Sequence, residues 1–149
     1  MAITATPSFA VTPRSIDAGS FSTANTNRDG TGTVATLAAG VAAGTRVNSV
    51  TITATATTTA GMVRIYLSTD TGTTWRLIKE LPVAAVTPSA TVQAWSSGPM
   101  PCNDYPQANA TAAPYYLPGI TLTGTSDLLG ASTHNAEAFA YFVSAADFT

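Results

Sequence analysis

The stretch MVRIYLSTDTGTTWRLIKEL, residues 62–81, predicts a β-hairpin. Its first strand alternates between two faces, with Val63, Ile65 and Leu67 inward and Arg64 and Tyr66 outward. This period of two residues is typical of a strand that buries one face. The loop TDTGTT that follows, residues 69–74, contains the glycine that short hairpin turns favour.

The second half of this hairpin returns to the core. We expect Trp75 and Leu77 to face inward, and Arg76 to face water beside Arg64. Upstream, VNSVTITATATTT (47–59) predicts a strand with Val50, Ile52 and Ala54 on one face and Ser49, Thr51 and Thr53 on the other. Apolar side chains therefore separate from the other side chains onto opposite faces in both regions.

Further short segments rich in β-branched residues are separated by turns. They are TVATLAAG (33–40), ATVQAWS (90–96), ITLTG (120–124) and AFAYFVSAADF (138–148), while the proline-rich residues 98–118 indicate a long loop. The final segment has apolar groups on both faces, which predicts a central or sandwiched strand. Together these patterns predict an all-β, single-domain β-sandwich of jelly-roll or Greek-key type.

The first 30 residues show little periodicity and end in the turn sequence Asp29-Gly30. We therefore expect an extended N-terminal arm over residues 1–30 and a β-sandwich domain over residues 31–149. On this division, deleting the arm would leave the sandwich folded.

The composition points to a surface with few charges. Only 9% of the residues are charged, against about 25% in an average soluble protein. The chain has 27 threonines and 27 alanines, so hydroxyl groups must supply much of its polar surface. Either copies of the protein or a partner cover this surface, or it is simply rich in hydroxyl groups.

Several classes of function receive no support from the residues. Six Lys and Arg among eight acids form no basic stripe for nucleic acid. No apolar run reaches the roughly 20 residues that span a membrane, and the N-terminus lacks the pattern of a signal peptide. The lone Cys102 cannot form a disulfide within the chain. The scattered His, Cys and carboxylates have no metal-ligand spacing, so we expect neither a metal nor a cofactor.

The only histidine lies in ASTHNAE, residues 131–137. If this segment is a strand, Ser132 and His134 share a face about 6–7 Å apart, and Glu137 points to the opposite face. A catalytic triad needs its groups within hydrogen-bond reach, so we do not expect an enzyme.

Sugar binding remains a candidate because exposed aromatic rings can stack on sugars. The available rings are Trp75, Trp95, Tyr105, Tyr115 and Tyr116. The alternative is that both tryptophans pack in the core, as their places in alternating strands suggest.

Three segments together resemble small virion structural proteins of tailed bacteriophages. They are ANTNRDGTGT (24–33), TATTTAGMVRIYL (55–67) running into TWRLIKELPVAAVTPSATV (74–92), and LGASTHNAEAF (129–139). Phage cement or decoration proteins of similar size are often jelly rolls that clamp capsid subunits. The resemblance therefore implies a non-enzymatic decoration protein on the outer capsid surface, made in the cytoplasm of the host bacterium.

This resemblance implies two partners: the major capsid protein, and the protein itself as a homodimer or homotrimer. Its motifs place six residues as candidates for such contacts, namely Asn27, Arg28, Asp29, His134, Asn135 and Glu137. The alternative is that all six make turn and strand-end hydrogen bonds inside one chain. Other functions left open are a tail or neck component and a carbohydrate-binding module for host attachment.

Overall fold

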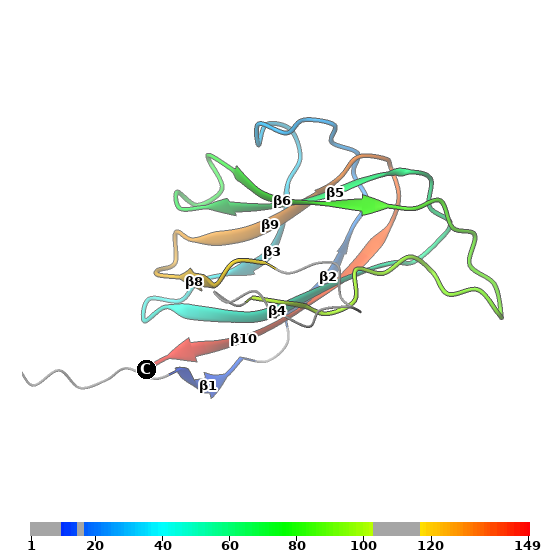
Figure 1. Cartoon of the computed structure of the whole chain (residues 1–149). Coiled ribbons are helices and arrows are strands. Elements are labelled where there is room, and N and C mark those ends of the chain that lie inside the picture. Colours follow the sequence, from blue (N-terminus) through cyan, green and yellow to red (C-terminus); the bar gives the residue numbers. More distant parts are fainter. Residues whose placement is uncertain (1–9, 15–16, 103–116) are drawn as a thin grey trace, which may run out of the picture.

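The computed structural model describes residues 10–14, 17–102 and 117–149, and these form a sandwich of two antiparallel β-sheets (Figure 1). Its strands are β1 (Ala10–Pro13), β2 (Asp17–Phe21), β3 (Ala35–Ala39), β4 (Thr45–Ala54), β5 (Gly61–Ser68), β6 (Arg76–Val83), β7 (Met100–Pro101), β8 (Ile120–Leu122), β9 (Leu128–Thr133) and β10 (Phe139–Phe148). Within these residues there is no helix. The predicted all-β sandwich is confirmed.

The strands pair as in a long hairpin that has been rolled up. In sheet A, β2 pairs with β10, and β4 pairs with β10, β7 and β8; in sheet B, the order is β3-β9-β5-β6. Early strands thus pair with late ones: β2 with β10, β3 with β9, β4 with β7 and β8, and β5 with β6. This nested order is that of a jelly roll, one of the two topologies expected.

The core lies between the inner faces of the two sheets. Its fully buried side chains include Val50, Ile52, Ile65, Leu129 and Phe139. Each such side chain contributes about 1.5–3 kcal/mol through burial. The alternation predicted for residues 47–59 is confirmed, because the inward set is buried and the hydroxyl set is half-buried.

The predicted hairpin is confirmed as β5 and β6, joined by a turn in which Thr71 and Gly72 have φ of 59° and 85°. A bulge changes the facing of β6, because Tyr66 pairs with Leu77 while Ile65 pairs with Lys79. As a result, Ile78 packs against the core and Leu77 is 37% exposed. The expectation that Leu77 faces inward was wrong.

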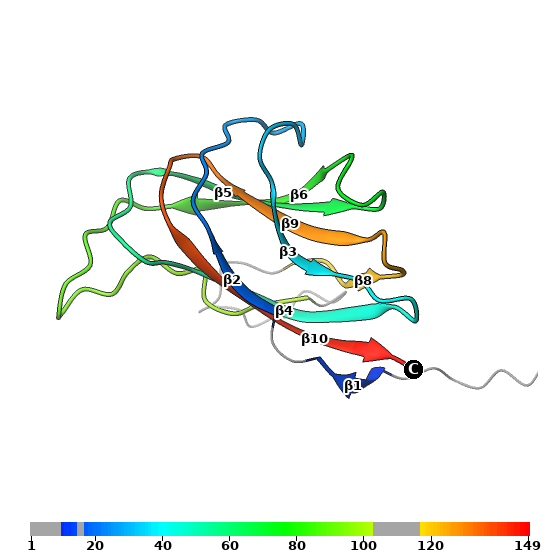
Figure 2. The ribbon, with the colours of Figure 1, turned by 180° about the vertical axis from the view of Figure 1, so that it is seen from behind.

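The outer face of sheet B is covered, contrary to expectation. Arg64 and Tyr66 do not face water but are 2% and 0% exposed. Trp75 is also buried, but against Gly30 and Gly130 rather than in the core between the sheets. The chain between β2 and β3 passes from sheet A to sheet B and packs here (Figure 2).

Part of the expected N-terminal arm contributes strands to the sandwich. β1 and β2 both pair with β10, along the edge opposite to β4 (Figure 2). Phe21 at the end of β2 is buried and stacks on Phe139, with 5.6 Å between ring centroids. Residues 1–9 of the expected arm lie outside the described residues.

Some of the remaining predicted strands are present in the structure and one is not. Strands form within residues 33–40, 120–124 and 138–148, and β10 is central as predicted. Residues 90–96 form no strand; only Ser96 makes an isolated bridge, to Thr53 of β4. The loop predicted over 98–118 contains the fragment β7, and residues 103–116 lie outside the described part.

Candidate functional site

The two segments that carry the six candidate residues lie side by side. Ala24 forms a parallel bridge with Thr133, and the N–H of Asn25 donates to the carbonyl of Thr133 at 2.7 Å. We call the segment 22–33 the strap. It packs on the outer face of sheet B and is hydrogen-bonded there to the end of β9. The structure thus brings together two regions more than 100 residues apart.

The strap is organised by its own side chains. The buried Asn25 donates from Nδ2 to the carbonyls of Thr31 and Thr33, both at 2.9 Å. Asn27 donates from Nδ2 to Thr31 Oγ1 at 2.8 Å. Asp29 accepts from the hydroxyl and the N–H of Thr31, which lowers the pKa of Asp29 below its ordinary value. These contacts form an Asx-type turn that closes within the strap.

Arg64 fixes the strap to sheet B. Its Nη1 donates to the carbonyl of Asn25 at 3.0 Å, and its Nε donates to Glu80 Oε1 at 2.9 Å. Arg28 of the strap donates to the same carboxylate oxygen at 2.9 Å, and Tyr66 Oη donates to the carbonyl of Asn27 at 2.9 Å. A buried guanidinium needs such partners, because an unpaired charge in the interior is costly.

Glu80 lies between the two arginines, and their charges affect its pKa. Partial burial raises its pKa, but the hydrogen bonds and charges of Arg64 and Arg28 outweigh this effect and lower the pKa below 4.5. The carboxylate therefore stays ionised and holds both cations in place near neutral pH.

The second group of candidates holds the turn between β9 and β10. The N–H of His134 donates to the carbonyl of Met62 at 2.8 Å. Asn135 Nδ2 donates to Thr59 Oγ1 at 2.9 Å, and Glu137 Oε1 accepts from the N–H of Thr59 at 2.7 Å. These side chains tie the turn to the loop between β4 and β5.

Arg64 also links the two groups, because its Nη2 lies 3.5 Å from His134 Nδ1. His134 directly follows the end of β9, and its imidazole lies beside Arg64, the residue that pairs with Ser132 across the sheet. Ser132 is buried, with its Oγ 3.5 Å from Tyr66 Oη. This arrangement can hold segments together, since among the described residues the imidazole contacts Arg64 and the Ser132 hydroxyl contacts Tyr66.

All six candidates therefore make hydrogen bonds inside one chain. Sequence reasoning missed the residues that connect them: Arg64, Glu80, Asn25 and Thr59. The available signal was an arginine within an otherwise apolar alternation in β5, since a buried position there requires a partner. Across residues 10–14, 17–102 and 117–149, no three His, Cys, Asp or Glu residues gather as metal ligands do.

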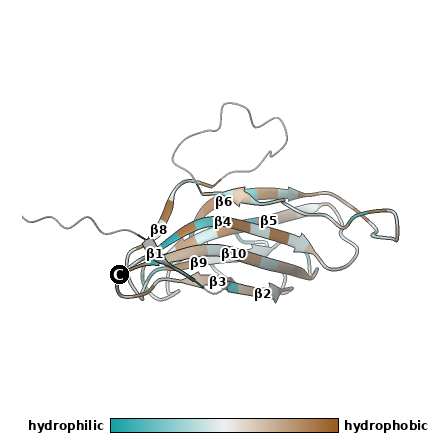
Figure 3. Cartoon of the chain, turned by 90° about the horizontal axis from the view of Figure 1, so that it is seen from below, coloured by the Kyte–Doolittle hydropathy of each residue, from teal (hydrophilic) through white to brown (hydrophobic). Residues whose placement is uncertain are grey.

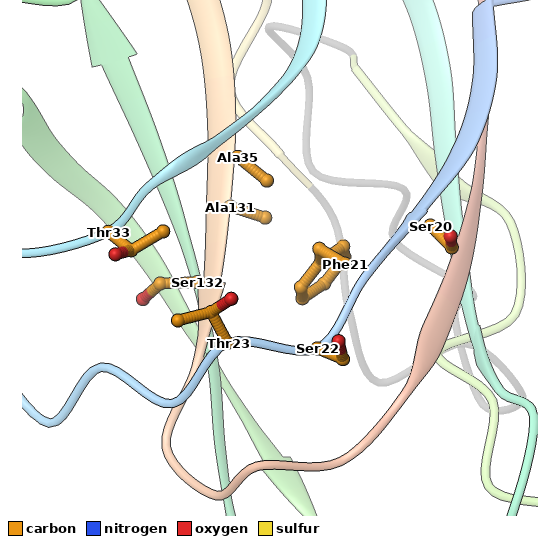
Figure 4. Close-up of a pocket in the computed structure, with 8 residues that line it drawn as sticks. All are labelled: Ser20, Phe21, Ser22, Thr23, Thr33, Ala35, Ala131 and Ser132. Carbon is orange, nitrogen blue, oxygen red and sulfur yellow. The ribbon is translucent and has the colours of Figure 1, made fainter.

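A pocket of about 260 Å³ opens where the strap leaves β2 (Figure 4). Figure 4 shows Phe21 and Thr23 facing Ala131 and Ser132 of β9. Further hydroxyls line it from Ser20, Ser22 and Thr33, and none of the lining residues is charged. The pocket suits a small neutral ligand better than an ion.

The aromatic candidates for sugar stacking are mostly unavailable. Trp75 is buried, and Trp95 is half-buried with its ring edge-on to Phe139, 5.8 Å between centroids. The three tyrosine candidates lie outside the described residues. Cys102 is buried, and desolvation raises the pKa of its thiol to about 12, so the thiol is protonated at neutral pH.

The described part of the chain contains no helix long and apolar enough to cross a membrane. Comparisons with protein-family models, with curated proteins and with solved structures each return no match.

Proposed function

We propose that this protein is a non-enzymatic capsid decoration protein of a tailed bacteriophage, which binds and stabilises the outer surface of the shell. Its partners would be the major capsid protein and further copies of itself, as a dimer or trimer. It would be made in the host cytoplasm and function on the virion.

The observation that carries this proposal is how the chain uses its few charges. Ion pairs join Arg14 to Asp17 and Asp147, and join Arg28 and Arg64 to Glu80. Carboxylates that accept hydrogen bonds from nearby backbone or hydroxyl groups are Asp29, Asp70, Asp127 and Glu137. Most described charges thus make contacts within the chain, and Arg28, Asp29 and Asp70 among them are exposed. The surface carries few charges because the sequence contains few.

Figure 3 colours the strands mostly pale to brown, with hydrophilic colouring confined to short stretches, and includes the residues of both faces of each sheet. The cores of protein interfaces are depleted of charged residues, so a chain with few charges suits extensive contact with other proteins. A jelly-roll sandwich with its turns fixed by internal hydrogen bonds supplies the rigidity that a cement between capsid subunits needs.

Quantitative mass spectrometry of purified particles tests this proposal. A copy number equal to that of the major shell protein, or a simple fraction of it, is the expected result. A handful of copies per particle would instead favour a tail or neck component. Absence from the particle would overturn a virion role altogether.

The pocket beside Phe21 favours one alternative, a carbohydrate-binding module. Its volume of about 260 Å³ lies just below the roughly 300–1,000 Å³ of typical ligand sites, so it has room for one small neutral sugar. Titration with monosaccharides, followed by Phe21 contacts in NMR spectra, would detect binding. Saturable binding combined with absence from particles would favour this alternative over the capsid role.

A further inference from the structure

The outer faces of the two sheets differ in how they are covered. The strap and Trp75 cover much of the outer face of sheet B, and Arg64 and Tyr66 beneath them are buried. On sheet A, no described residue of this chain packs over the side chain of Phe142 in the same way, and it is 41% exposed in the middle of β10. Of the large apolar side chains of the described chain, Leu77, Val92 and Phe142 are exposed, and of these three Phe142 alone lies on a central strand.

The surroundings of Phe142 are flat and uncharged. Register places Thr51 of β4 on one side of it and Ala18 of β2 on the other. The same face continues through Ser20, Ser49, Thr53, Ala140 and Ser144. We call these eight residues the Phe142 face. None of them is charged, and the nearest charged position along β4 in this direction is Arg46.

We propose that the Phe142 face is where two copies of this protein meet, related by a two-fold axis. This inference deepens the proposed self-association and rests on it for its biological setting. In a two-fold contact, each surface meets its own image, so a charged patch would face like charge. A face without charge avoids this repulsion, and its hydroxyls can hydrogen-bond across the contact as donor or acceptor.

The shape of the face also matches its own image. The ring of Phe142 projects between the small side chains of Ala18 and Ala140. A projection beside a shallow area allows the ring of each copy to pack over the alanines of the other. Sheets that pack face to face lie about 10 Å apart, which leaves room for one such aromatic layer.

The area of the Phe142 face determines how tightly the two copies are expected to bind. Three strands about 4.8 Å apart and five residues rising about 3.3 Å each span roughly 240 Å². A standard interface buries about 800 Å² on each partner, so this dimer is weak and depends on concentration. A shell that holds many copies close together would favour the same contact through a high effective concentration.

Sedimentation velocity of the purified protein from about 10 µM to about 1 mM tests the inference without particles. We expect the wild-type protein to shift from monomer towards dimer over this range. Phe142→Asp places like charges in the contact and should remove the shift. Ser20→Asp on the same face should do the same, and it guards against a folding defect at position 142.

The matched control is Val92→Asp, since Val92 is 47% exposed in the loop between β6 and β7. This variant should dimerise like the wild type. A wild-type protein that stays monomeric throughout, or folded Phe142→Asp and Ser20→Asp variants that still dimerise, would overturn the inference. Because the shell is absent, failure here is distinct from absence of the protein from particles, which would overturn the capsid proposal.

Discussion

Arg64 is the residue at which the strap, the edge strand β6 and the end of β9 meet. Replacing it with methionine keeps a side chain of similar volume. The carbonyl of Asn25 then loses the hydrogen bond from Arg64, and the carboxylate of Glu80 keeps one arginine partner instead of two. Hydrogen bonds to charged groups contribute about 1.5–3 kcal/mol each, so we expect Arg64→Met to lower the free energy of unfolding by about 3 kcal/mol. Urea denaturation measures this change.

The matched control for this substitution is Arg46→Met on β4. Arg46 is exposed, so the change should stay within about 0.5 kcal/mol. Equal effects of the two substitutions would mean that Arg64 does not fix the strap.

For single residues, burial was predicted correctly from the sequence where it follows from alternation along the residue's own strand. Val63 and Ile65 were placed correctly from alternation alone. Arg64 was placed wrongly because the cover over it comes from the strap, almost 40 residues earlier in the chain. Leu77 was misplaced because a bulge at Ile78, opposite Ile65 and Tyr66, changes the facing of β6, and a bulge leaves no mark in the alternation.

Among the elements, the turn between β5 and β6 depends on one carboxylate. Asp70 Oδ1 accepts from the N–H of Thr74 at 2.8 Å and from the hydroxyl of Ser68 at 2.7 Å, which lowers the pKa of Asp70 to about 2. Because the folded pKa lies below the unfolded value near 3.8, this stabilisation is complete above about pH 4 and is lost as pH falls towards 2.

Asp70→Asn should therefore fold, since its amide oxygen still accepts hydrogen bonds, but should lose this acid dependence. Thermal unfolding between pH 5 and pH 2 would show a shallower fall in Tm for the variant than for the wild type. Between pH 6 and pH 5, where Asp70 is ionised in both states, the two proteins should respond to pH alike. Identical slopes at low pH would contradict the role of Asp70.

The packing of Trp75 on β9 depends on a glycine. A Cβ at Gly130 would lie 2.6 Å from Trp75 Cζ3 and 2.7 Å from Val34 Cγ1. Gly130→Ala should displace the indole, destabilise the protein by about 1–3 kcal/mol and shift the tryptophan fluorescence. At Gly124, nothing lies within 4 Å of an added Cβ, so Gly124→Ala should leave the fluorescence unchanged. Unaltered emission from Gly130→Ala would show that the indole packs elsewhere.

On the scale of the whole molecule, the first strands belong to the sandwich. Deleting residues 1–22 removes β1, β2 and the ring of Phe21 from the core. Loss of a buried phenylalanine alone costs about 3–5 kcal/mol, out of the roughly 5–15 kcal/mol that stabilise a domain. We expect this truncation to lose cooperative thermal unfolding. A truncated protein that still unfolds cooperatively would contradict this role of β1 and β2.

The sequence allowed the fold class to be predicted because β4, β5 and β8 carry clear alternation and β10 is rich in apolar residues on both faces. Pairing of β2 with β10 was not predicted, because DAGSF contains a glycine and small polar residues and shows no period of two. Residues 90–96 looked like a strand, yet their contact with β4 is short: the carbonyl of Trp95 accepts from the N–H of Ala54, and Ser96 forms an isolated bridge with Thr53. The candidate site was located in part, since its segments were singled out but the arginine that joins them was not.

The nested pairing of strands also determines when the chain can fold during its synthesis. β10 lies between β2 and β4 in sheet A, so the middle of that sheet does not exist until the tenth strand has left the ribosome. Before then, β2 and β4 have no common neighbour, whereas β5 and β6 can already form their local hairpin. Folding must therefore wait for contacts between distant parts of the chain, which are slow to form and leave apolar strand faces uncovered in the meantime.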